Sequence, residues 1–196
     1  MSDTAKRPAT YAELEAVPPH LVAEIIFGDL VTHPRPVPRH ATAQNALSGE
    51  LTGPFQKGAG GPGGWIFMIE PELHLGPHVV VPDIAGWRRE RMPRMPETAF
   101  VETPPDWVCE FLSPSTEKRD RGPKRRIYAT YGVGHLWHID PLARFLEVFE
   151  LQDKHWVLFE TYQDAEVVPA PPFAAVPFAL SELWPLDPPA TNARDG

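Results

Sequence analysis

One short segment of this chain, Trp107-Val108-Cys109-Glu110-Phe111-Leu112, is apolar on both faces of any strand it forms, except at Glu110. A strand of that composition belongs in the middle of a sheet, where both faces are covered. Asp83 is a second carboxylate beside apolar residues, because it follows the run Val79-Val80-Val81-Pro82. A carboxylate among apolar neighbours costs several kcal/mol unless its charge is compensated. The sequence predicts a central strand at 106–112 and a neighbouring strand running from Val79 through Asp83 to Trp87.

Two carboxylates on neighbouring strands indicate a shared compensating charge, and a divalent metal ion is the natural candidate. Mg²⁺ is bound through one or two carboxylates together with water and phosphate oxygens. Asp83 and Glu110 therefore point towards phosphodiester chemistry. Two structural alternatives stay open. Asp83 could cap a turn after its proline, and Glu110 could be a buried structural carboxylate paired with an arginine.

The rest of the chain alternates helical and strand-like segments. The patterns predict helices over 10–17, 21–27 and 39–55, and a further helix that follows a turn at 113–116 and ends near Gly132. They predict strands over 29–33, 65–70, 72–75, 135–140, 145–151 and 155–161. This order indicates an α/β fold with a mixed central β-sheet flanked by helices. We expect a single domain over residues 10–186 of the 196, with flexible tails at 1–9 and 187–196.

Composition limits the cellular setting and the partners. No window approaches about 18 consecutive apolar residues, and the N-terminus carries no signal-peptide core, so we expect a cytoplasmic protein without a membrane span. The single cysteine, Cys109, excludes an internal disulfide and should be buried. The net charge of −8 opposes a nucleic-acid partner, but four arginines over 88–94 and six basic residues over 118–126 make up ten of the 18 basic residues. Such local patches can attract phosphates, although solvated loop and helix faces share the pattern.

Four segments between residues 10 and 151 carry a further signal. They read "AEIIFGDLV", "PRPVPRHATAQNAL", "VVVPDIAGW" and "PDWVCEFLSPSTEKRDRGPKRRIYATYGVGHLWHIDPLARFLEVFEL". These segments resemble the bacterial putative restriction endonuclease family of the PD-(D/E)XK nuclease superfamily. The resemblance implies a restriction-endonuclease-like core and Mg²⁺-dependent hydrolysis of DNA, with Mn²⁺ able to substitute.

The resemblance also assigns site residues. It makes Asp83 and Glu110 the two acidic motif residues that hold the metal, and it matches Glu24 to a helix glutamate that completes the metal site. The usual motif lysine would fall at Leu112, so Lys124 on the following helix is the candidate that replaces it. A lysine ammonium near a metal-bound water can stabilise hydroxide and the developing negative charge. Glu24 and Lys124 could instead lie on solvated helix faces.

Further residues have roles that the sequence leaves less defined. The DNA-contacting residues are expected to be Lys118, Arg119, Arg121, Arg125 and Arg126. His40 opens the long helix where the family often has histidine, and a capping, packing or catalytic role stays open. His135 and His138 flank Trp137 with alternation, so we expect them to share one sheet face. We interpret them as structural or surface residues and not as a zinc pair, because further Cys or His ligands at suitable spacing are lacking.

Three functions fit these residues. The first is a metal-dependent DNA endonuclease. The absent lysine at Leu112 motivates the second, a catalytically inactive nuclease-like module that binds DNA or a partner, and the third is metal-dependent hydrolysis of RNA or a nucleotide. We also expect a homodimer, because many nucleases pair two sites about a two-fold axis. The aromatic residues of the C-terminal third exceed what one hairpin face can bury; they are Trp137, Phe145, Phe149, Trp156 and Phe159.

Overall fold

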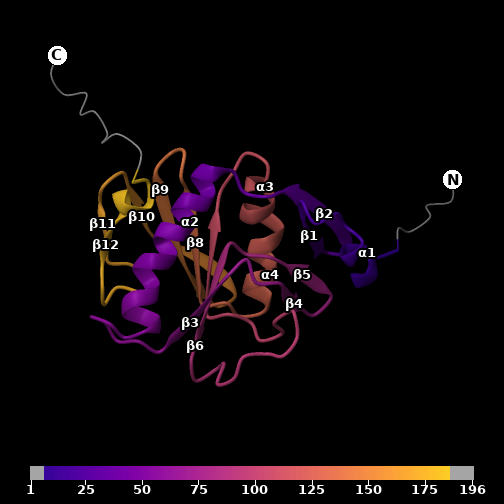
Figure 1. Cartoon of the computed structure of the whole chain (residues 1–196), viewed down its shortest axis with the longest axis horizontal. Coiled ribbons are helices and arrows are strands. Elements are labelled where there is room, and N and C mark those ends of the chain that lie inside the picture. The colour runs from indigo at the N-terminus through magenta and orange to yellow at the C-terminus, as the bar shows by residue number, and fades with distance from the viewer. Residues whose placement is uncertain (1–6, 186–196) are drawn as a thin grey trace, which may run out of the picture.

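The structure of the protein is a computed structural model that describes residues 7–185. Its centre is a six-stranded sheet with strand order β10-β9-β8-β7-β6-β3 (Figure 1). The strands are β3 (Trp65–Ile69), β6 (Ile84–Arg88), β7 (Trp107–Phe111), β8 (His135–Asp140), β9 (Phe145–Gln152) and β10 (His155–Gln163). β7 and β8 are parallel, and the other neighbours are antiparallel. The mixed central sheet and the interior position of the Glu110 strand are confirmed.

Helix α2 (Pro38–Leu51) covers one face of this sheet and continues into a π-helical turn, η1 (Thr52–Gln56). Ala43, Leu47 and Leu51 recur every four residues, so one stripe of α2 packs on Trp107 and Trp137. The end of the described chain joins the same layer through β11 (Val167–Val168), β12 (Phe178–Ala179) and the 3₁₀ turn η3 (Leu180–Leu183). The predicted helix over 39–55 is therefore confirmed.

A second helical segment covers the opposite face (Figure 1). It runs from α3 (Glu117–Arg119) through a π turn, η2 (Asp120–Lys124), into α4 (Arg125–Thr130). Ile127 of α4 packs with Val108 and Leu136, whose side chains point to this face because strand residues alternate. Pro123 lies inside the π turn. A proline has no N–H to donate and clashes with the carbonyl four residues earlier in an α-helix. Pro123 therefore disfavours a regular α-helical turn at the position where the wider π turn occurs.

A smaller sheet lies beside the second helical segment, with strand order β2-β1-β5-β4. Its strands are β1 (Leu21–Ile26), β2 (Asp29–Pro34), β4 (Leu73–Leu75) and β5 (His78–Val80). The helix predicted over 21–27 is wrong, because these residues form β1. Phe27 and Gly28 both have positive φ, 50° and 85°, and they close a tight hairpin in which Ile26 faces Asp29. The branched side chains of this segment suit a strand that is covered by neighbouring layers.

The strand predicted from Val79 to Trp87 is interrupted. β5 ends at Val80 in the small sheet, and β6 begins at Ile84 in the large one. Pro82 cannot donate to a ladder, so pairing stops there and the chain crosses between sheets. Asp83 lies at this crossing and not inside a strand.

The N-terminal region begins with α1 (Tyr11–Glu15), which starts with a capping box formed by Thr10 and Glu13. Residues 7–9 fall in a predicted tail, yet the Ala9 N–H donates to the Gly28 carbonyl at 2.8 Å. The remainder of both predicted tails lies outside the described residues. Within residues 7–185, every helix is too short or too polar to cross a lipid bilayer. Cys109 is buried, as expected.

Candidate active site

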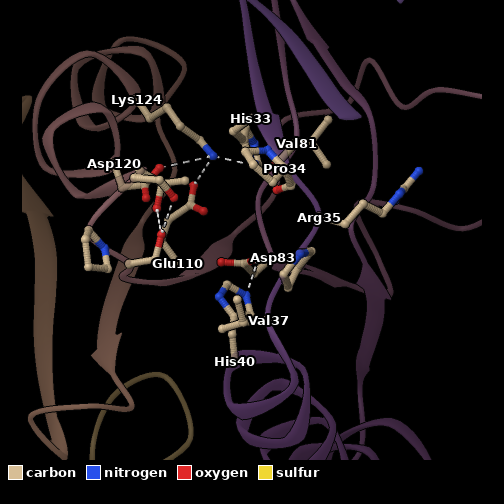
Figure 2. Close-up of a pocket in the computed structure, with 15 residues that line it drawn as sticks. His33, Pro34, Arg35, Val37, His40, Val81, Asp83, Glu110, Asp120 and Lys124 are labelled. Atoms are coloured by element: carbon tan, nitrogen blue, oxygen red, sulfur yellow. Dashed lines mark hydrogen bonds and ion pairs between the residues drawn. The ribbon is translucent and has the colours of Figure 1, made fainter. Parts of the chain in front are cut away.

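Asp83 and Glu110 meet at one end of the central sheet. β6 and β7 are antiparallel neighbours with Ile84 opposite Cys109, so the start of β6 lies beside the end of β7. An Asp83 carboxylate oxygen, Oδ2, accepts a hydrogen bond from the Phe111 backbone N–H at 2.7 Å. Both carboxylates line a pocket of about 270 Å³. Figure 2 shows Glu110 with Lys124 and Asp120 on one side of this pocket, and Asp83 with His40 on the other.

Asp83 is held by side chains from α2, one at its carboxylate and one at its backbone. His40 Nε2 lies 2.8 Å from Asp83 Oδ1, and Gln44 donates to the Asp83 backbone carbonyl at 2.7 Å. The His40 ring packs at 5.3 Å from the ring of Phe111. The role of His40 that the sequence left open is thus one of contact with Asp83, and capping is excluded because Val37 is the N-cap of α2.

Glu110 is buried and held through one oxygen. Its Oε1 accepts a hydrogen bond from the Tyr128 hydroxyl at 2.6 Å and lies 2.8 Å from Lys124 Nζ. Burial raises the pKa of Glu110 well above its usual range, and the nearby charges of Asp120 and Asp83 act in the same direction. Lys124 opposes this shift. A cation in the pocket would favour the ionised carboxylate further.

Lys124 points inward from the π turn, and its side chain is only 3% exposed. The ammonium donates to the Val81 carbonyl at 3.1 Å and lies 3.2 Å from Glu24 Oε1. Burial alone lowers the pKa of Lys124, but the carboxylates of Glu110 and Glu24 outweigh burial and hold it well above its usual range. The lysine is therefore a buried ammonium beside Glu110, and a solvated position is excluded.

Glu24 lies on β1, so its assignment to a helix is wrong, and its side chain is completely buried. Glu24 Oε1 accepts from the Val81 N–H at 2.9 Å, and Oε2 lies 3.4 Å from Arg119 Nε without a hydrogen bond. Glu24 does not line the pocket. In the part of the chain that the structure describes, no group of three or more His, Cys, Asp or Glu side chains could hold a metal ion. Glu24 is thus a partner of Lys124 and Arg119 in this structure.

Two residues that sequence reasoning missed complete the site. Asp120 and Tyr128 lie four positions before and after Lys124, so all three side chains share one face of the helical segment. Asp120 Oδ1 is 3.5 Å from Lys124 Nζ, and burial raises the pKa of Asp120. The four-residue spacing was the available signal, but it lies within a basic segment that resembles a solvated face.

The charges of the site fit a divalent cation. Glu24, Glu110 and Asp120 provide three carboxylates, whereas Lys124 and Arg119 provide two positive charges. Asp83 adds a further carboxylate on the facing wall of the pocket. Mg²⁺ usually keeps several waters and needs only one or two carboxylates from the protein. Asp83 and Glu110 therefore suit Mg²⁺, although they do not form an all-protein cage.

The predicted DNA-contacting residues lie in different surroundings. Arg119 points inward to Glu24, and Arg121 pairs with Glu117 at 3.0 Å and with Glu147 at 2.6 Å. Arg125 is half-buried with its guanidinium carbon 4.4 Å from the centre of the Phe149 ring, and burial lowers the pKa of Arg125. Lys118 and Arg126 are exposed. The structure therefore gives only part of this segment a free positive charge.

The two histidines of β8 do not share a sheet face, contrary to the sequence prediction. Positions 135 and 138 have opposite parity, and strand side chains alternate between faces. His138 is fully buried against Phe149, and neither of its ring nitrogens has a hydrogen-bond partner among the described residues. His135 is partly exposed, and its Nδ1 lies 4.0 Å from a carboxylate oxygen of Glu150.

The mixed sheet, with Asp83 and Glu110 at the junction of β6 and β7, is a restriction-endonuclease-like fold. The chain belongs to the putative restriction endonuclease family (Uma2), whose sequence profile matches residues 8–181. The family resemblance and the α/β fold class are thereby confirmed, and a nuclease-type hydrolase is supported.

A solved structure has the same fold. It is the crystal structure of a putative nuclease belonging to DUF820 from Anabaena variabilis, with a TM-score of 0.72 and 23% sequence identity. The match covers 91% of this chain and 98% of that one. At this identity the likeness establishes the fold alone. Among curated proteins no match is found.

Proposed function

We propose that the protein is a Mg²⁺-dependent endonuclease that hydrolyses phosphodiester bonds of DNA in the pocket between Asp83 and Glu110. The observation that carries this proposal is the convergence of both carboxylates on one pocket, with Lys124 Nζ 2.8 Å from Glu110. Family membership supports a nuclease. A buried ammonium beside two carboxylates at the end of a central sheet is a costly arrangement, which argues for a catalytic use.

In this mechanism Asp83 and Glu110 would hold Mg²⁺, and Mn²⁺ could substitute. The metal would polarise a phosphoryl oxygen and lower the pKa of a bound water. The protein supplies the arrangement around it. His40 orients Asp83 from one wall, while Tyr128 and Lys124 orient Glu110 from the other. Lys124 would also supply positive charge against the negative charge that grows on the phosphate.

One observation favours the second candidate, a nuclease-like module without catalysis. An ammonium has three N–H donors. Lys124 already contacts the Val81 carbonyl, Glu110 and Glu24, and Leu112 occupies the usual lysine position. Unless one contact is released, Lys124 has no donor for a substrate. Cleavage assays therefore decide between the two candidates.

The decisive experiment compares cleavage of supercoiled plasmid DNA by the wild type and by Asp83→Ala, Asp83→Asn, Glu110→Ala and Glu110→Gln, with Mg²⁺ or Mn²⁺. We expect nicking by the wild type and its loss in all four variants. Glu97→Gln, at an exposed loop carboxylate, is the matched control. Equal cleavage by the wild type and the four site variants would refute the proposal. Salt-sensitive DNA binding without metal-dependent cleavage would favour the inactive module. Cleavage of an RNA substrate tested in the same assay, without cleavage of DNA, would favour metal-dependent hydrolysis of RNA.

We also propose a homodimer that pairs two copies of β10. Trp137 and Phe149 are buried within one chain, so the aromatic content gives less support than the sequence indicated. The edge strand β10 gives stronger support for a dimer, because its apolar residues Val157, Leu158 and Phe159 are 42%, 51% and 50% exposed. An apolar edge strand is a template for pairing with another chain. Antiparallel pairing would relate the two copies by a two-fold axis, the symmetry that also relates the two strands of a DNA duplex.

A further inference from the structure

A second pocket, of about 590 Å³, lies between α4 and the turn that joins β9 to β10. The positively charged side chains that line it are Arg121, Arg125, Arg126 and Lys154, and His155 adds a ring nitrogen. None of its lining residues is acidic. The whole chain carries a net charge of −8. A pocket lined by positive charge on an acidic protein indicates an anionic ligand.

The cations of this pocket divide into two kinds. Arg121 is engaged with Glu117 and Glu147, and Arg125 is packed on Phe149. Arg126 and Lys154 are exposed, and neither forms an ion pair with another residue of the described chain. Two charges are therefore free for a ligand.

The walls of the pocket are fixed to each other. The Trp156 indole N–H donates to the Arg125 carbonyl at 2.8 Å, which ties the hairpin to α4. Asp153 and Lys154 form a two-residue turn with φ of 48° and 63°. Two consecutive left-handed residues make the tight turn that matches strand twist, and here neither residue is glycine. The backbone that carries Lys154 is thus held against the helix that carries Arg126.

We propose that this pocket binds a backbone phosphate of DNA other than the phosphate that is cleaved. The inference rests on the proposed nuclease function. The segment 120–126 contributes side chains to both pockets. Asp120 and Lys124 line the first, and Arg121, Arg125 and Arg126 line the second. The free cations are exposed, so each binds a single phosphate weakly in water, whereas a polyanion gains from several contacts at once.

The test measures binding of a fluorescent DNA duplex of about 20 base pairs by anisotropy at several salt concentrations, in EDTA so that no cleavage occurs. The double variant Arg126→Gln/Lys154→Gln should bind about tenfold more weakly, and the slope of log K against log salt should fall by about 0.9 for each lost contact. Lys57→Gln is the matched control. Lys57 is exposed and follows η1, which packs beside β3 at the opposite sheet edge from β10. The duplex affinity and salt slope of Lys57→Gln should equal those of the wild type.

The possible outcomes separate this inference from the proposed function. An unchanged affinity and slope in the double variant would overturn the inference, even if Mg²⁺-dependent cleavage is observed. The expected loss of slope would support it even if cleavage is not observed. Calorimetry with inorganic phosphate provides a second arm. Phosphate binding that disappears in the double variant while duplex affinity stays unchanged would assign the pocket to a free phosphate and overturn the DNA assignment. Equal melting temperatures of the variants establish that the fold is intact.

Discussion

The Tyr128 hydroxyl and the Lys124 ammonium contact the same oxygen of Glu110, Oε1, at 2.6 Å and 2.8 Å. Both donors come from one face of the helical segment, and Glu110 comes from the neighbouring central strand. Neither contact uses the other oxygen, Oε2, and Glu110 would hold the metal in the proposed mechanism. The helix therefore controls the direction in which the carboxylate faces the pocket.

Tyr128→Phe should separate this hydrogen bond from packing, because only the hydroxyl is removed. Loss of the partner of a buried carboxylate should lower the free energy of unfolding by about 1–3 kcal/mol. It should also raise the Mg²⁺ concentration needed for half-maximal cleavage. Urea denaturation and a Mg²⁺ titration measure both effects. The control is Tyr131→Phe, whose hydroxyl makes no hydrogen bond within the described residues. Equal behaviour of the two variants would contradict the assigned role.

Lys124→Ala should affect both stability and cleavage. It leaves Glu24 and Glu110 without their shared cation, which should cost about 3–5 kcal/mol. Single-turnover cleavage by the folded variant should fall by about 10²-fold. Lys124→Arg should not restore the rate, because a planar guanidinium cannot replace a compact ammonium. Wild-type cleavage in Lys124→Ala, together with a loss in Lys118→Ala or Arg125→Ala, would show that the catalytic lysine is misassigned.

His40→Ala should act through Asp83, because the 2.8 Å contact orients that carboxylate. Removing such a supporting contact typically costs about 10–100-fold in metal affinity or activity. His40→Gln, which retains a donor, should lose less. The measurement is calorimetric binding of Mn²⁺ beside cleavage rates. Wild-type values in both variants would leave His40 with a packing role against Phe111 only.

His138 should make stability depend on pH. Burial lowers the pKa of His138 to about 3, and Arg121, Arg125 and Lys124 act in the same direction. The unfolded histidine binds its proton near pH 6.5, approximately its reference pKa. Between about pH 6.5 and 3 the unfolded state therefore holds one more proton, and stability falls with falling pH by up to about 1.4 kcal/mol per unit. His138→Leu should remove this contribution. Urea denaturation at several pH values tests it, and parallel pH profiles for both proteins would refute it.

The assembly should depend on β10. Light scattering of the wild type at tens of micromolar should give a dimer mass, and Leu158→Lys should give a monomer mass. Leu142→Lys, at an exposed apolar residue of the β8–β9 turn, is the control and should remain dimeric. A monomeric wild type at that concentration would rule out the proposed pairing.

The sequence predicted the structure correctly where neighbouring residues along the chain determine the environment of a segment. The strand around Glu110 is apolar on both faces, so its central position followed from composition. Reasoning failed where the surroundings lie far along the chain. Arg119 and Lys124 look alike within one basic segment, and nothing local indicates that both turn towards Glu24 on β1. Glu24 itself was placed on a helix because the tight turn at Phe27–Gly28 was not recognised.

The π turn at Asp120–Lys124 sets the rotation about the helix axis of the side chains that follow it in α4. Adding one residue to an α-helix rotates everything after it by about 100°. The π turn is already one residue wider than an α turn, so a further residue inserted between Lys124 and Arg125 would turn Tyr128 away from Glu110 and also redirect Arg126 away from the hairpin. Both surfaces of the segment depend on the same residue count. Variation among proteins with this arrangement should therefore alter the composition of residues 120–126 far more readily than their number.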